Sequence, residues 1–153
     1  MHTSSLALPP RINPAWRIGI IHAAFHPEIV AALVESAQKL LIKAGIVQSN
    51  ITFHAVPGSF EIPLIGAVLL EKKEVDALIG LGVIIEGETH HARLIAESVT
   101  KGMMDLQIQY GKPFGFEVLY VKTLEQAKAR QHKGEEAALA VLWALAEIEN
   151  VRR

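Results

Sequence analysis

The 153-residue sequence contains no cysteine. Disulfide bonds, thiolate catalysis and cysteine-ligated zinc or iron–sulfur clusters are therefore excluded. The absence of cysteine also suits a reducing compartment, which leads us to expect a cytoplasmic protein. The length predicts one domain of ordinary size, with a core large enough to fold without covalent cross-links.

An excess of charge of either sign is also missing. There are 15 lysine and arginine residues against 16 aspartate and glutamate residues, and the formal net charge is -1. No basic block gathers anywhere along the chain. Binding to nucleic acid therefore has little support, since it depends on neutralising many phosphates.

Long apolar runs are absent as well. No uninterrupted apolar segment approaches the roughly 20 residues that a membrane helix needs, so we expect no membrane partner. Residues 1–16 lack a basic start followed by an apolar run, and prolines interrupt them. We expect an extended amino-terminal arm there, not a signal peptide. Residues 17–153 are expected to form the single domain.

Hydrophobic residues nevertheless make up 50% of the chain. This fraction is high for a small soluble monomer, whose surface-to-volume ratio demands many polar positions. An unusually apolar core is one explanation. Burial of apolar residues between subunits is the explanation we prefer, and it predicts an oligomer.

Short apolar runs alternate with longer segments of helical period, which is typical of repeated strand–crossover–helix units. The predicted strands are residues 17–23, 51–56, 77–85 and 114–121. The predicted helices are residues 27–44, 61–71, 90–110, 124–131 and 134–151. In the third of these helices the helical period predicts a buried side made of Leu94, Ile95, Val99, Met103 and Leu106. With right-handed crossovers, these elements form an α/β fold. We predict a flavodoxin-like, three-layer α/β/α sandwich around a four-stranded parallel sheet.

Ligands of such sheets bind beyond the carboxyl ends of the strands. This rule selects the loops at residues 24–27, 57–61 and 86–91 before any motif is considered. Phe25 in the first loop is either a core residue or a platform for a flat ligand. Phe60 in the second loop is expected to be a core residue. Glu61 is either a favourable first-turn carboxylate or a partner for a polyhydroxylated ligand.

The third loop contains the neighbouring residues His90 and His91. Adjacent helical residues point about 100° apart, so the pair cannot easily hold one metal ion. Glu88 and Thr89 precede the helix, where free backbone N–H groups and the helix dipole favour an anion. A phosphate site beside a proton-transfer histidine is therefore plausible, although a solvated helix end explains the same residues.

Four motifs occur in the order AAFHPEI, VPGSFEIP, GVIIEGETHH and EQAKAR. Together they resemble the lumazine synthase family, and the resemblance covers residues 17–148. The family condenses 5-amino-6-(D-ribitylamino)uracil with 3,4-dihydroxy-2-butanone 4-phosphate. The product is 6,7-dimethyl-8-ribityllumazine, a riboflavin precursor, and phosphate and water are released. The resemblance implies small-molecule substrates and neither a metal nor an organic cofactor.

The resemblance also implies roles for individual residues. It assigns proton transfer to His91 and leaves His90 without a role. The residues implied to bind the ribitylaminouracil are Phe25, Ser59, Phe60, Glu61, Val83, Ile84, Ile85 and, from a neighbouring subunit, Phe116. The residues implied to bind phosphate are Glu88, Thr89, Arg130 and Lys133.

The family forms homopentamers with active sites between adjacent subunits, and some members assemble twelve pentamers into an icosahedral shell. The sequence leaves the choice between these assemblies open. Its departures from the family pattern are His26 in place of an asparagine, Glu86 in a position often basic, and a shortened stretch before Lys133. A non-catalytic flavin- or lumazine-binding paralogue, or a scaffold shell, is the alternative. Retention of His91, Thr89 and Arg130 together favours an enzyme, because a binder of the heterocycle needs no phosphate site.

Overall fold

The computed structural model describes residues 6–153. Its strands are β1 (Ile18–Ala23), β2 (Ile51–Val56), β3 (Ala77–Ile85) and β4 (Phe114–Val121). Its helices are α1 (Pro27–Lys43), α2 (Ile62–Glu71), α3 (His91–Tyr110), α4 (Leu124–Ala129) and α5 (Gly134–Val151), with short 3-10 turns η1 (Gln48–Asn50) and η2 (Ser59–Glu61). The predicted order of elements is confirmed.

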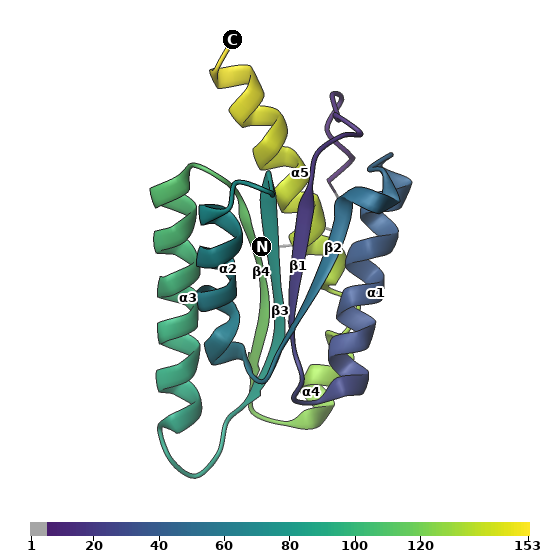
Figure 1. The fold of residues 1–153 in the computed structure, drawn as a ribbon. Coiled ribbons are helices and arrows are strands. Elements are labelled where there is room, and N and C mark those ends of the chain that lie inside the picture. The colour runs from purple at the N-terminus through teal and green to yellow at the C-terminus, as the bar shows by residue number, and fades with distance from the viewer. Residues whose placement is uncertain (1–5) are drawn as a thin grey trace.

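The four strands form one parallel sheet in the order β2-β1-β3-β4 (Figure 1). Ile18 of β1 is the register partner of both Ile51 of β2 and Ala77 of β3. β3 is buried along almost its whole length, as its continuous apolar sequence predicts for a central parallel strand. All four strands end at the same edge of the sheet, the lower edge in Figure 1.

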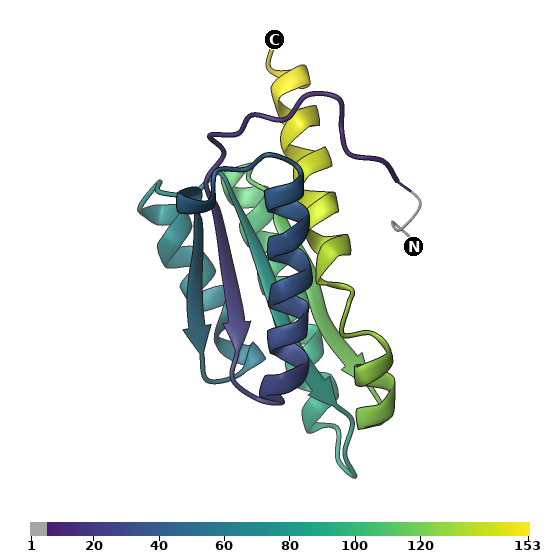
Figure 2. The ribbon, with the colours of Figure 1, turned by 90° about the vertical axis from the view of Figure 1, so that its right-hand side faces the viewer.

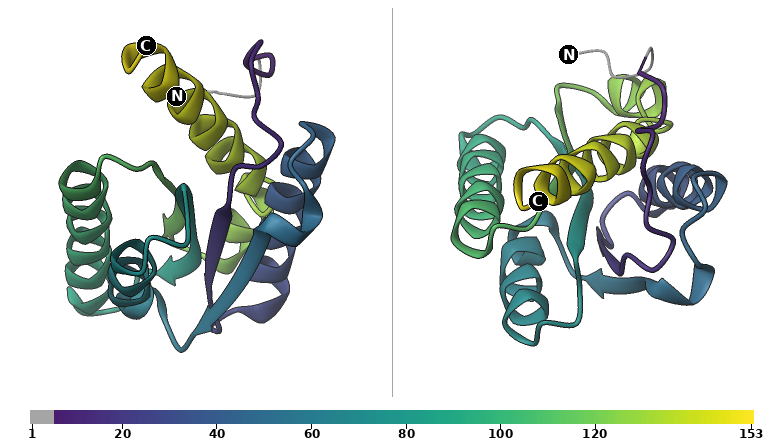
Figure 3. Two further views of the ribbon diagram at one scale, coloured as in Figure 1. Left: turned by 45° about the horizontal axis from the view of Figure 1, so that its top comes forward. Right: turned by 90° about the horizontal axis from the view of Figure 1, so that it is seen from above.

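Helices cover both faces of the sheet, which confirms the three-layer α/β/α architecture (Figure 3). One core cluster joins the sheet to α1, α4 and α5 and includes Leu33, Leu81 and Leu142. The other core cluster joins the opposite face to α2 and α3 and includes Leu78 and Met103. Each helix therefore buries one apolar face against the sheet.

The expectation for Leu94 was wrong. The helical period of α3 placed it on the buried side, but its side chain is 61% exposed. Val99 and Met103, further along the same helix, are buried as predicted. The first turn of α3 lies at the carboxyl edge of the sheet (Figure 1). Leu94 lines a cavity there.

Residues 6–16 run across α5 without forming a helix or a strand (Figure 2). The indole nitrogen of Trp143 donates a hydrogen bond to the carbonyl of Ala7 at 2.8 Å. Trp16 makes a second link, from its indole nitrogen to the carboxylate of Glu149 at 3.1 Å. The remainder of the expected arm, residues 1–5, lies outside the described residues.

No helix within residues 6–153 combines the length and the apolar character needed to cross a membrane.

Candidate functional site

A cavity of about 740 Å³ opens at the carboxyl edge of the sheet, where the loops after β1, β2 and β3 meet α3. The residues that line it are Phe25, His26, Gly58, Ser59, Phe60, Glu61, Val83, Ile84, Ile85, His91, Ala92, Leu94, Ile95 and Ser98. The first two loops selected by the strand-end rule, and His91 at the end of the third, therefore line one cavity.

The loop after β1 contributes Phe25 and His26. The ring of Phe25 is 65% exposed and packs over the backbone of Gly58, where an added Cβ would lie 3.1 Å from the ring. His26 has a left-handed backbone, with φ 56 and ψ 60, and directly precedes α1. This conformation is unfavourable for most residues other than glycine and asparagine, and such strain is common at binding sites.

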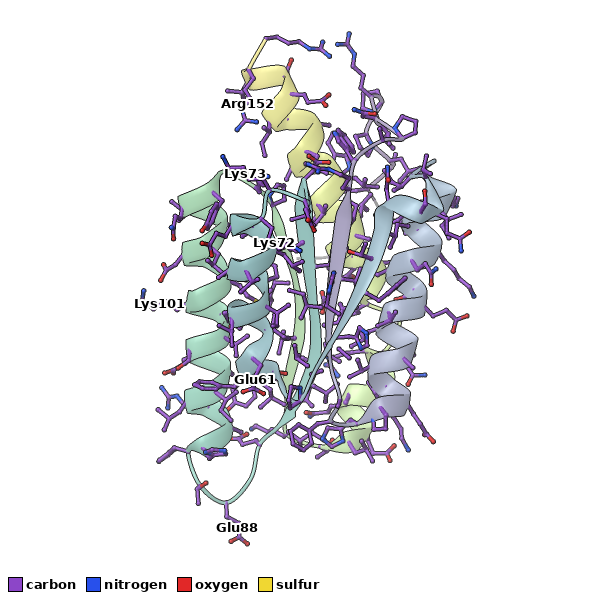
Figure 4. The ribbon with its side chains drawn as sticks, in the orientation of Figure 1. Glu61, Lys72, Lys73, Glu88, Lys101 and Arg152 are labelled. Carbon is purple, nitrogen blue, oxygen red and sulfur yellow. The ribbon has the colours of Figure 1, made fainter. Side chains whose placement is uncertain are left out.

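The loop after β2 is held by a hydrogen bond from the backbone N–H of Gly58 to the Glu61 carboxylate, at 3.0 Å. This bond fixes the Glu61 side chain at the cavity, near the lower edge of the sheet in Figure 4. Phe60 is 61% exposed, whereas Ser59 is only 6% exposed. The Ser59 hydroxyl is buried and has no hydrogen-bond partner among the described residues.

The end of β3 forms an apolar wall. The side chains of Val83 and Ile84 are buried, and Ile85 is partly buried. Because β3 ends at the cavity, backbone groups of its last residues would lie beside a ligand bound in that space. The arrangement suits a flat heterocycle that needs both apolar contact and hydrogen bonds along one edge.

The two neighbouring histidines occupy different places. His91 is the first residue of α3 and lines the cavity, whereas His90 occupies the N-cap position without a side-chain capping bond and does not line it. The backbone N–H of His91 donates a hydrogen bond to the hydroxyl of Thr89 at 3.3 Å. Within residues 6–153, no group of three His, Asp or Glu side chains is placed to hold a metal ion.

The four residues expected to bind phosphate do not line the cavity in the single chain. Glu88 and Thr89 are exposed in the loop before α3, and Figure 4 shows Glu88 pointing away from the molecule. Arg130 follows α4 and donates from its guanidinium to the carbonyl of Gln126 at 2.9 Å. Lys133 precedes α5, on the opposite side of the sheet from α3.

Phe116 also lies outside this cavity. It lines a second hollow of about 760 Å³ between α3 and β4, together with Met104 and Tyr120. These three side chains are between 43% and 51% exposed. The single chain therefore separates Phe116 from the other aromatic residues expected to contact the substrate.

Several cavity residues were not selected from the sequence. Leu94, Ile95 and Ser98 line the cavity beside His91. Their distances of three, four and seven residues from His91 are the helical spacing that places side chains on one face. Once His91 is assigned to the site, this spacing predicts that the three residues lie beside it.

A family model for 6,7-dimethyl-8-ribityllumazine synthase matches residues 15–149. The chain belongs to the 6,7-dimethyl-8-ribityllumazine synthase family. It is 40% identical over 131 residues to the protein of that name from Aquifex aeolicus, a match that covers 82% of this chain and 85% of the relative. The relative of the same name from Cytophaga hutchinsonii is 40% identical over 134 residues, or 84% of each chain. The relative from Paracidovorax citrulli is 40% identical over 122 residues, or 79% of each.

The lumazine synthase match contains every residue that lines the cavity, because it begins before Phe25 and ends after Ser98. It also contains α4 and most of α5. The family relationship therefore concerns the cavity as well as the fold around it.

Proposed function

We propose that the chain is a lumazine synthase, which condenses 5-amino-6-(D-ribitylamino)uracil with 3,4-dihydroxy-2-butanone 4-phosphate in riboflavin biosynthesis. The observation that carries this proposal is the meeting of Phe25, Glu61 and His91 in one cavity of a chain from this family. The product is 6,7-dimethyl-8-ribityllumazine, and phosphate and water are released. The proposed location is the cytoplasm, which the cysteine-free composition supports.

The ribitylaminouracil is proposed to occupy the cavity. Phe25 stacks on the pyrimidine, and the backbone at the end of β3, from Val83 to Ile85, pairs with its polar edge. Glu61 is held in place by the N–H of Gly58, so its remaining carboxylate oxygen is available to hydroxyl groups of the ribityl chain. Ser59 and Phe60 contact the same chain from η2.

Much of the rate enhancement is proposed to come from holding two reactants together. The amine attacks the ketone, the carbinolamine loses water, and phosphate leaves; the second amine then closes the ring on the remaining carbonyl carbon with loss of a second water. These steps need little chemical assistance once the reacting atoms are aligned, because alignment replaces a bimolecular encounter. His91, at the cavity wall, is the residue proposed to move protons between the amine and the leaving oxygen atoms.

The phosphate is proposed to bind at the amino-terminal end of α3, where Glu88 and Thr89 contribute backbone N–H groups. A helix start favours an anion through its unpaired N–H groups and its dipole. Arg130 and Lys133 are proposed to add positive charge. In the single chain they lie apart from the cavity, so this part of the site depends on their position in the assembled protein.

Replacing Arg130 by alanine should raise the KM for the butanone phosphate about ten-fold, because a charge-assisted contact to phosphate is lost. The KM for the ribitylaminouracil should change less than two-fold. Lys128→Ala is the matched control, since it removes an exposed positive charge from α4, the helix that Arg130 follows. Steady-state kinetics with each substrate varied in turn measures both constants, and equal effects of the two variants would refute the assignment of Arg130.

We propose that the chain forms a homopentamer in which Phe116 of one subunit completes the cavity of its neighbour. Exposed apolar side chains on α3 and β4 support such a contact. They are Leu94, Met104, Ile108, Phe116 and Tyr120. Assembly of twelve pentamers into a shell remains an open alternative that native mass measurement distinguishes from a pentamer.

Co-expression of His91→Ala and Phe116→Ala subunits tests the shared site. If each site takes His91 from one subunit and Phe116 from the next, random mixing leaves about a quarter of the sites with both residues intact. The mixed protein should then regain about a quarter of the wild-type kcat per subunit. Activity equal to the mean of the two single variants would show that both residues act within one subunit.

Parallel measurement of phosphate and lumazine tests the proposed reaction. Lumazine is followed by its absorbance, and inorganic phosphate is measured in samples of the same mixture. The proposal predicts equal amounts of both, formed faster than in a protein-free control that corrects for the spontaneous reaction. Release of phosphate without lumazine would contradict it.

A further inference from the structure

The buried hydroxyl of Ser59 lies against the backbone of Gly82 in β3. A Cβ atom added to Gly82 would overlap with Ser59 Oγ, while it would lie at ordinary contact distances of 3.4 Å from Ala23 Cβ and 3.5 Å from Ser59 Cβ. Only the hydroxyl oxygen therefore occupies the volume that a side chain on residue 82 would need. No positive φ is involved at Gly82, so the constraint there comes from space alone.

The contact bears on the position of the cavity wall. Ser59 is the first residue of η2, and Glu61 is its last. Phe60, between them, is 61% exposed and so provides little anchorage. The side chain of Ser59, 6% exposed, is the buried element of the turn. Phe60 and Glu61, which line the cavity, follow Ser59 directly in the turn.

The Ser59 hydroxyl is not explained by the stability of the fold. It is buried without a hydrogen-bond partner among the described residues. Burial of an unpaired hydroxyl is unfavourable, and a methyl group would avoid that cost. The oxygen does, however, fill the space above Gly82. Close packing at this contact holds the turn in one well-defined position.

We propose that Gly82 is a positioning residue for the ribitylaminouracil. By lacking a Cβ it leaves the space in which the Ser59 hydroxyl sits, and this fit sets the position of η2 and hence of Phe60 and Glu61 at the cavity. The inference rests on the proposed function for the identity of the ligand. Gly82 does not line the cavity, so it acts only through Ser59.

Calorimetry with 5-amino-6-(D-ribitylamino)uracil measures how a substitution at Gly82 changes the binding of this compound, separately from turnover. Gly82→Ala should raise the Kd for this compound about ten-fold, because the added methyl group takes the space of the Ser59 hydroxyl and displaces that side chain. The KM for the butanone phosphate should change less than two-fold, since its proposed site lies at α3. A rise of similar size for both substrates would overturn the proposal.

The double variant Ser59→Ala, Gly82→Ala provides the decisive comparison. Removal of Oγ eliminates the overlap and leaves only the ordinary contacts at 3.4 and 3.5 Å. Its Kd should therefore match that of Ser59→Ala alone within about two-fold, although it carries the same methyl group as Gly82→Ala. A double variant that binds as weakly as Gly82→Ala, or more weakly, would refute the role of the Ser59 contact.

Gly66→Ala is the control for general damage to the core. A Cβ there would lie 2.6 Å from the ring of Phe114, away from the cavity. This variant should lower the melting temperature and leave the Kd within two-fold of wild type. An equal loss of binding in Gly66→Ala would attribute the effect to destabilisation and overturn the proposal.

The proposed function and the role of Gly82 fail in different ways. If the wild-type protein binds the ribitylaminouracil but forms no lumazine, the proposed function fails and the Kd series still decides the role of Gly82. If the wild-type protein does not bind the compound, both fail.

Discussion

Replacing His91 by alanine is expected to lower kcat for lumazine formation about 10- to 100-fold. His91 is the imidazole at the cavity wall beside the start of α3, where a proton can be passed to and from a bound substrate. The loss is smaller than for enzymes that depend on one strong acid or base, because alignment of the two substrates persists in the variant. Steady-state kinetics at saturating concentrations of both substrates measures kcat.

His90→Ala is the matched control for this prediction. It removes the neighbouring imidazole, which stands at the N-cap position of the same helix, makes no capping hydrogen bond and does not line the cavity. Its kcat should stay within about two-fold of wild type, since proton transfer requires contact with the reacting atoms. Equal losses in the two variants would refute the assignment of proton transfer to His91.

Replacing Glu117 by glutamine is expected to stabilise the protein at pH 8 by about 1–2 kcal/mol, after allowance for partial exposure of the side chain. Burial between β4 and α5 raises the pKa of Glu117 from 4.5 to about 7. The negative charge of Glu136 contributes to this rise, and the positive charge of Lys133 opposes it. The folded protein therefore disfavours the charged form, which the unfolded chain accepts freely.

The sign of the pH dependence follows from this raised pKa. Between pH 4.5 and about 7 the folded chain holds a proton on Glu117 that the unfolded chain has lost. The free energy of unfolding of the wild-type protein should thus fall as the pH rises through this window. In Glu117→Gln this part of the dependence should disappear, and the two proteins should differ little at pH 4.

Denaturant unfolding at pH values from 4 to 8 measures the difference. Glu147→Gln on the exposed side of α5 is the matched control and should leave the pH dependence of stability unchanged. Parallel stability curves for Glu117→Gln and the wild-type protein would contradict the prediction.

The apolar pattern predicted most of the fold because it matched the burial of each element. β3 and α5 begin and end at the predicted residues, since β3 is continuously apolar and a glycine opens α5. The pattern failed at Leu94, because helical period cannot tell where a helix extends past the elements that would cover it. It also missed η1 and η2, which are too short to show a period.

Part of the candidate site could also be predicted from the sequence. The strand-end rule found the loops of Phe25, Glu61 and His91, because all strands of a parallel sheet end at one edge. It could not relate Phe116 and Lys133 to those loops. Phe116 faces α3, and its neighbour Glu117 faces α5, because adjacent residues of a strand point to opposite faces of the sheet. A contact made only between subunits leaves no trace in one chain's pattern.

The most direct test of the central proposal counts product molecules for each subunit. The purified protein is mixed with a large excess of both substrates, and lumazine is measured against a protein-free control. The proposal predicts that lumazine above the control exceeds the number of subunits many times over. No more lumazine than the control, or at most one molecule per subunit, would contradict it and indicate a binding protein instead of an enzyme.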